Sequence, residues 1–151
     1  RPNVAVLRTF SKAYGLAGLR IGWFAGPPAI AAALRDVRHY YDVIDVAIAT
    51  ALASLDDDEE VERRRRDNRE MRGRLEAGID ALGLERLPSD TNFVAVIVDD
   101  APAVAAHLHG HGILVRSLDD LERPDLLRIT VGTAQDVDAV LAALTALPAP
   151  G

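Results

Sequence analysis

The densest group of chemically useful side chains lies near the start of the chain, between Thr9 and Arg20. Lys12 follows a short apolar run, and Ser11 and Thr9 place hydroxyl groups one and three residues before it. A lysine amine can form a Schiff base with an aldehyde, whereas hydroxyl and guanidinium groups bind a phosphate dianion. The segment therefore favours an aldehyde that carries a phosphate ester. Pyridoxal 5′-phosphate is the cofactor that combines these two groups.

Lys12 is also the only lysine among the 17 Lys and Arg residues of the chain. A coding bias towards arginine would leave a lysine where arginine cannot replace it. Arginine stays protonated, whereas a lysine can lose its proton and act as a nucleophile. The alternative, a single leftover surface lysine, stays open on this observation alone.

The composition is that of one ordinary globular domain, or slightly more. The 151 residues are 49% hydrophobic and 26% charged, which excludes a disordered or collagen-like chain. The absence of cysteine excludes disulfides and Cys-ligated metals, and we expect no metal site. A net charge of −6 argues against nucleic acid or an anionic membrane as a partner.

The first residues do not have the pattern of a signal peptide, so a cytoplasmic location is the default expectation. No stretch reaches the ~20 apolar residues that a membrane-spanning helix needs. The chain begins with Arg1 rather than Met, and we expect it to be part of a longer protein.

Hydrophobic periodicity and turn residues predict an α/β fold with a C-terminal α+β unit. The predicted strands cover residues 4–7, 20–25, 93–98, 113–116 and 126–131. The predicted helices cover residues 29–38, 46–55, 61–82, 103–108 and 134–147. We expect three parts, which are residues 1–55, a connecting long helix in 56–84, and a small domain in 85–151.

The segment SKAYGLAGLRIG at residues 11–22 resembles the cofactor-attachment motif of class I/II pyridoxal-phosphate-dependent aminotransferases, and is closest to the histidinol-phosphate aminotransferase subgroup. Three further segments follow in the family's order, SDTNFV at 89–94, GILVR at 112–116 and LRITVGT at 127–133. The resemblance covers almost the whole chain. It implies a partial fold-type-I transferase, in which residues 1–55 end the large domain.

The resemblance also implies roles for individual residues. Lys12 would hold pyridoxal 5′-phosphate and then act as the general base that moves a proton from the substrate. Thr9, Ser11 and Arg20 would bind the cofactor phosphate. Arg128 would anchor a substrate anion through its planar fork, and Arg116 would add a second anion contact. Asn92 lies at a position that the family often keeps, with no contact assigned to it.

The function implied by the resemblance is transfer of an amino group between histidinol phosphate and 2-oxoglutarate, by a homodimer. An aromatic amino-acid aminotransferase is the alternative within the class. A non-catalytic fragment or interaction module is the alternative outside it, because the family's other cofactor contacts lie upstream of Arg1. The segment YYDVID at 40–45 also departs from the family's usual pattern, which leaves the substrate open.

Two other motifs have simpler explanations. The arginine run at 63–66 lies between acidic residues on a predicted helix, and pairs such as Glu59–Arg63 and Glu62–Arg66 account for it better than binding of nucleic acid does.

For Arg128 and Arg116, the alternative to substrate binding is an ordinary position on a strand or at the surface. The histidines at 107, 109 and 111 alternate with other residues around Gly110, which favours an exposed turn over a metal site.

Overall fold

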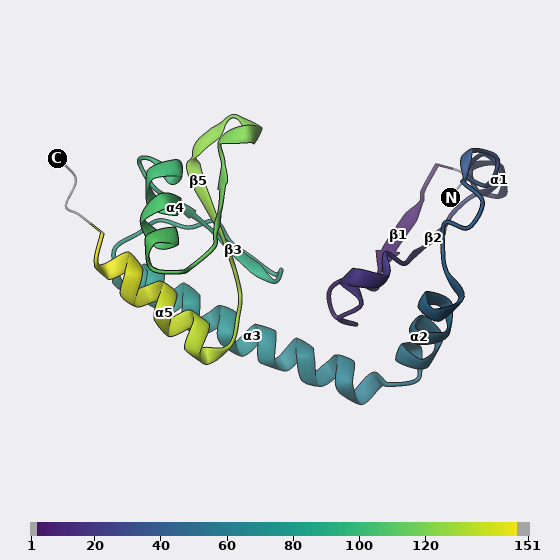
Figure 1. Cartoon of the computed structure of the whole chain (residues 1–151), viewed down its shortest axis with the longest axis horizontal. Coiled ribbons are helices and arrows are strands. Elements are labelled where there is room, and N and C mark those ends of the chain that lie inside the picture. The colour runs from purple at the N-terminus through teal and green to yellow at the C-terminus, as the bar shows by residue number, and fades with distance from the viewer. Residues whose placement is uncertain (1–2, 148–151) are drawn as a thin grey trace. The chain divides into compact units, whose positions relative to one another are not determined.

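The computed structural model describes residues 3–147, and by their contacts these group into two compact units (Figure 1). The first unit comprises residues 1–65 and the second residues 66–151. The three-part division predicted above, at residues 55 and 84, stays a prediction. In the described residues no helix combines the length and the apolar content needed to cross a bilayer.

The first unit begins with an antiparallel pair of strands, β1 (Val6–Thr9) and β2 (Gly22–Ala25). The pairing runs from Val6 opposite Ala25 to Thr9 opposite Gly22. Gly22 is required here, because a Cβ atom at this position would lie 2.5 Å from the carbonyl oxygen of Arg8. A short 3₁₀ turn, Ala17–Leu19, lies in the loop between the strands.

Both strand predictions in this unit need correction. The first strand begins two residues later than predicted, and its four side chains are exposed rather than buried. The second strand begins at Gly22 rather than at residue 20. Arg20 has a φ of +50°, in the left-handed region, and therefore cannot continue an extended strand.

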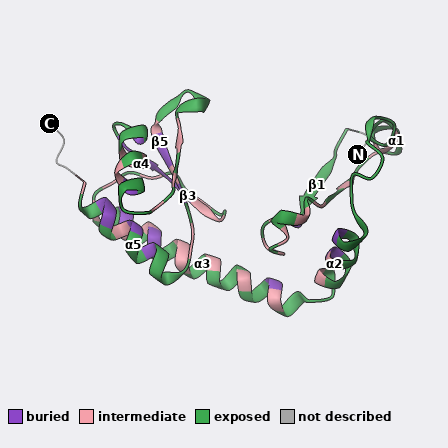
Figure 2. Ribbon diagram, viewed as in Figure 1, coloured by how far each residue is buried: buried purple, intermediate pink, exposed green. Residues whose placement is uncertain are grey.

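Two helices follow, α1 (Pro28–Val37) and α2 (Asp45–Leu55). Pro28 is well placed in the first turn, where its missing N–H would be unpaired in any case. On α2 the small residues Ala47 and Ala51 are buried. Large apolar side chains of the same helix are exposed, namely Val46, Ile48, Leu52 and Leu55. The ribbon of α2 carries the green of exposed residues beside the purple of buried ones in Figure 2.

The long helix α3 (Asp58–Ala81) starts in the first unit and continues into the second. Acidic side chains fill its first turn, where they oppose the helix dipole favourably. Carboxylates of the same helix pair with three residues of the arginine run, which agrees with the prediction of pairing within the helix. Glu60 pairs with both Arg63 and Arg64, and Glu62 pairs with Arg65.

The second unit is a three-stranded antiparallel sheet with helices packed on one face, which confirms the predicted α+β architecture. The sheet order is β3 (Phe93–Ile97), β5 (Arg123–Thr130) and β4 (Arg116–Leu118). The helices are α3, α4 (Ala101–Gly110) and α5 (Ala134–Thr145). Their buried side chains meet those of the sheet in one core, comprising Leu75, Ile79, Val94, Val96, Leu108, Leu127, Ile129, Val137 and Val140 among others.

The strand predicted at 113–116 lies later, at Arg116–Leu118. Gly112, with φ +76°, ends helix α4, and the amide of Ile113 donates back to the carbonyl of Leu108. The amide of Ile113 is therefore used to close the helix. Pairing with β5 starts only at Arg116.

We expect Gly15→Ala to destabilise the first unit. Gly15 has φ +71°, and a Cβ atom there would overlap the guanidinium of Arg64. The left-handed conformation alone costs an alanine about 1–2 kcal/mol. Gly18→Ala is the matched control, because no heavy atom lies within 4 Å of its added Cβ atom. Denaturation followed by fluorescence of Trp23, on β2, measures both. Equal stability of the two variants would contradict the account.

We expect the start of α3 to lose stability when Glu60 is protonated. Hydrogen bonds from Arg63 and then Arg64 lower the pKa of Glu60 from its usual 4.5 to about 2. A lowered pKa contributes stability that is complete above pH 4.5 and is lost as the pH falls towards about 2. Thermal unfolding across this range should therefore be less pH-dependent in Glu60→Gln than in the wild type, with Glu59→Gln as control. A carboxyl of Glu60 that titrates near 4.5 by NMR would contradict this.

Candidate active site

The four residues predicted to bind the cofactor lie at the end of β1 and in the loop that leads to β2. Thr9 is the last residue of β1, and Ser11 and Lys12 follow it directly. The amide of Phe10 donates to the carbonyl of Ile21 at 3.1 Å, which closes the mouth of the loop. Arg20 immediately precedes Ile21, so the two strand ends bring Arg20 back towards Ser11.

Hydrogen bonds within the loop fix the backbone around Lys12. The amide of Ser11 donates to Thr9 Oγ1 at 3.0 Å, and the amide of Gly15 donates to the carbonyl of Lys12 at 2.9 Å. Lys12 itself is exposed, and its amine has no hydrogen bond or ion pair with any residue in 3–147. An exposed, unpaired amine on a fixed backbone is open to attack a carbonyl carbon.

Arg20 is turned towards its own loop. Its Nη1 donates to the carbonyl of Ala17 at 2.7 Å, and its left-handed backbone directs the chain into β2. One guanidinium nitrogen of Arg20 is therefore used in this hydrogen bond. A guanidinium group has five N–H donors, so others are left over. Arg20 keeps donors for an anion at the mouth of the loop.

Phe10 anchors this loop, a role that sequence reasoning missed. It is only 4% exposed, in the middle of a segment whose other members are exposed or half-buried. Its ring contacts that of Tyr14, with the ring centres 4.8 Å apart. The sequence feature that could have predicted its burial is an apolar residue between the polar Thr9 and Ser11.

The sequence gives no indication of the contact between Gly15 and Arg64, which lie some fifty residues apart in the chain.

The two residues predicted to bind substrate, Arg116 and Arg128, come together in the second unit. They are direct partners across the antiparallel ladder of β4 and β5. Side chains of directly opposite residues lie on the same face of a sheet, with Cβ atoms about 4.5–5.5 Å apart. Like charges in that arrangement repel each other, so an anion that binds both would relieve a repulsion built into the sheet.

The two arginines have different surroundings. Arg116 pairs with Asp120, with Nη2 and Oδ2 2.7 Å apart, and both side chains are more than half exposed. Arg128 is half-buried and stacks its guanidinium on Phe93, with Cζ 4.5 Å from the ring centre. Among residues 3–147, Arg128 has no carboxylate partner. Its charge is therefore not neutralised within the described part of the chain.

Asn92 precedes this face of the sheet. Its backbone carbonyl accepts a hydrogen bond from the amide of Val131 at 2.9 Å, which extends the pairing of β3 and β5 by one step. The structure gives Asn92 a part in holding the sheet end.

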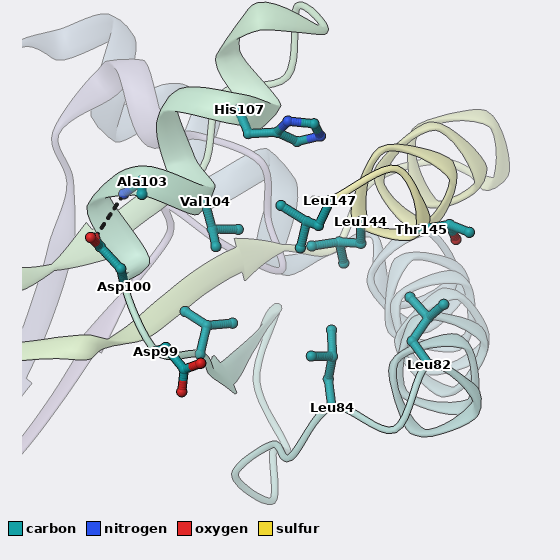
Figure 3. Close-up of a pocket in the computed structure, with 11 residues that line it drawn as sticks. Leu82, Leu84, Asp99, Asp100, Ala103, Val104, His107, Leu144, Thr145 and Leu147 are labelled. Atoms are coloured by element: carbon teal, nitrogen blue, oxygen red, sulfur yellow. Dashed lines mark hydrogen bonds between the residues drawn. The ribbon is translucent and has the colours of Figure 1, made fainter. Parts of the chain in front are cut away.

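A cavity of about 590 Å³ in the second unit contains none of the predicted site residues (Figure 3). Leucine and valine side chains form most of its wall, with Asp99, Asp100 and His107 at its edge. Asp100 caps helix α4 by accepting from the amide of Ala103 at 2.9 Å. A ring nitrogen of His107 lies 3.1 Å from the carbonyl of Ala143. In the described residues no group of three acidic or histidine side chains is placed to hold a metal ion.

Comparison with known proteins places these residues in a family. The family model for aminotransferase class I and II matches residues 1–144. Histidinol-phosphate aminotransferase from Roseobacter denitrificans is 45% identical over 145 residues, which are 94% of this chain and 40% of that protein. Histidinol-phosphate aminotransferase 2 from Pseudomonas aeruginosa is 42% identical over 144 residues, 95% of this chain and 39% of that protein.

A solved structure shares the fold. Histidinol-phosphate aminotransferase from Sinorhizobium meliloti, in complex with pyridoxal-5′-phosphate, superposes with a TM-score of 0.81 at 35% identity. The match covers 95% of this chain and 40% of that one. The chain thus spans about 40% of the length of the relatives it matches. It is a partial fold-type-I structure, and it belongs to the class I and II aminotransferases.

Proposed function

We propose that the chain is part of an enzyme that moves an amino group between histidinol phosphate and 2-oxoglutarate with pyridoxal 5′-phosphate as cofactor. The observation that carries this is the exposed Lys12 amine, held on a fixed loop between two hydroxyl residues and Arg20. The names of the relatives from Roseobacter and Pseudomonas support the amino donor. The cofactor bound by the Sinorhizobium relative supports pyridoxal 5′-phosphate.

The residues of the loop fit this cofactor in their chemistry. Lys12 Nζ would bond to the aldehyde carbon, whose oxygen would leave as water, and Thr9, Ser11 and Arg20 would donate to the phosphate. When bound, the cofactor supplies an electron sink for the carbon that bears the amino group. Once the amino group of the substrate has displaced Lys12 Nζ from the aldehyde carbon, the freed neutral amine would carry the proton taken from the substrate carbon.

In the proposed reaction, Arg128 and Arg116 hold the substrate by its negative groups. Arg128 is the better placed of the two, because no carboxylate in residues 3–147 competes for it. Arg116 must exchange Asp120 for the ligand, and an exposed ion pair of this kind contributes at most about 1 kcal/mol. A substrate with two anionic groups gains from both arginines.

The proposal includes a homodimeric enzyme, as the family resemblance implies, and a cytoplasmic location, as the first residues of the chain favour. The exposed apolar side chains of α2, with Leu52 at 60% exposure, support an association with further protein surface.

Trapping with borohydride tests the assignment of Lys12. The chain is mixed with pyridoxal 5′-phosphate, reduced and digested, and we expect a pyridoxyl adduct on the peptide that contains Lys12. Lys12→Arg should lose this adduct, because the α-amino group is then the main remaining amine. Labelling of the α-amino group alone in the wild type would contradict the proposal.

Arg20→Gln extends the same experiment to the phosphate contact. The variant should lower labelling by pyridoxal 5′-phosphate, but leave labelling by pyridoxal, which has no phosphate, unchanged. An equal loss with both reagents would show that Arg20 supports the loop rather than binding the phosphate.

A further inference from the structure

Phe93 lies beside Arg128 on the sheet face that carries both arginines. In the pairing of β3 and β5, Arg128 is opposite Ala95, and Phe93 is two residues away on the same face. A diagonal neighbour of this kind is within reach of an aromatic side chain, and the small Ala95 leaves room for it. The distance of 4.5 Å from Cζ to the ring centre is within the cation–π range of about 6 Å.

Hydrogen bonds from the preceding loop fix the backbone of Phe93. The carbonyl of Phe93 accepts from Ser89 Oγ at 2.5 Å and from Thr91 Oγ1 at 3.1 Å. The carbonyl of Thr91 in turn accepts from Asn68 Nδ2 and Arg72 Nη1 of α3, both at 3.1 Å. The backbone of Phe93 is therefore held directly by its own loop, and the loop is held by α3.

A ring and a carboxylate hold an arginine in different ways. A carboxylate fixes the guanidinium but neutralises it, as Asp120 does for Arg116. The face of an aromatic ring attracts the guanidinium through its quadrupole and leaves the N–H groups at the edge of the fork unused. Phe93 can therefore fix Arg128 in place and keep its charge available for a ligand.

We propose that Phe93 is a positioning residue, which holds the Arg128 guanidinium ready for the substrate anion. This rests on the proposed function in one respect, the assignment of Arg128 as the anion contact. The effect on the guanidinium itself does not depend on that assignment, so the two can be tested separately.

The experiment measures the mobility of the Arg128 side chain by ¹⁵N relaxation of its Nε–Hε group in the labelled chain. We expect an ordered Nε–Hε in the wild type, a mobile one in Phe93→Leu, and restored order in Phe93→Tyr, which keeps the ring face. The Nε–Hε group of Arg116 is the internal control, because the guanidinium of Arg116 pairs with Asp120 rather than with Phe93 and its mobility should not change. Unchanged order of Arg128 in Phe93→Leu, or mobility in Phe93→Tyr as well, would overturn the proposal.

Titration with glutarate, an unreactive dicarboxylate, then separates the two assignments. Phe93→Leu should weaken glutarate binding about 2- to 5-fold, which corresponds to the about 0.5–1 kcal/mol of a cation–π contact at an exposed site. Arg128→Ala should weaken it further. If Arg128→Ala leaves the affinity unchanged, the anion contact of the proposed function fails, while the relaxation result still decides the role of Phe93. If Arg128→Ala weakens binding and Phe93→Leu does not, the role of Phe93 fails alone.

Discussion

The antiparallel register of β5 between β3 and β4 determines what the second unit can do. Because successive side chains of a strand point to opposite faces, this register places Leu127 and Ile129 in the core with Val94 and Val96. The same register places Arg128 on the other face of the sheet, where it shares that face with its cross-strand partner Arg116. A slip of one residue would bury the arginine and expose the leucine. The apolar core thus holds in place the two positive charges that face away from it.

A comparable constraint shapes the first unit. The strands β1 and β2 are short, and the pair formed by Phe10 and Ile21 joins their ends where the Lys12 loop begins. Phe10 is buried, whereas Lys12 two residues later is exposed. Burial of one side chain therefore orients the segment that presents the other. Few other side chains of this unit are buried, so the loop depends on hydrogen bonds and on tight contacts such as that of Gly15 with Arg64.

The sequence was informative wherever the signal was local. Glycine, proline and hydrophobic periodicity predicted the existence and type of all five helices and of the strands, and the α+β form of the second unit. The predicted strand starts were wrong where a helix cap or a left-handed residue prevented the apolar segment from continuing as a strand. Residues 113–115 are apolar enough for a strand, but the amide of Ile113 closes helix α4 instead. The left-handed backbone of Arg20 delays the start of β2.

The candidate site was predictable as a set of residues but not as an arrangement. The spacing of Thr9, Ser11, Lys12 and Arg20 already pointed to an aldehyde and a phosphate. The placement of Arg116 opposite Arg128 depends on the register of a sheet, and the stacking on Phe93 depends on which residues share a face. Neither follows from one strand's pattern taken alone. Roles for these residues in catalysis remain our proposals.

The central claim is that the register of β5 makes Arg116 and Arg128 one anion-binding site. A double-mutant cycle on glutarate affinity, with Arg116→Ala, Arg128→Ala and the double variant of the chain, tests this most directly. If both arginines hold one ligand, the two losses will not add, and the coupling will fall in the range of about 0.5–3 kcal/mol that is typical of residues sharing a partner. Losses that simply add, or single variants that bind glutarate as well as the wild type does, would contradict the claim.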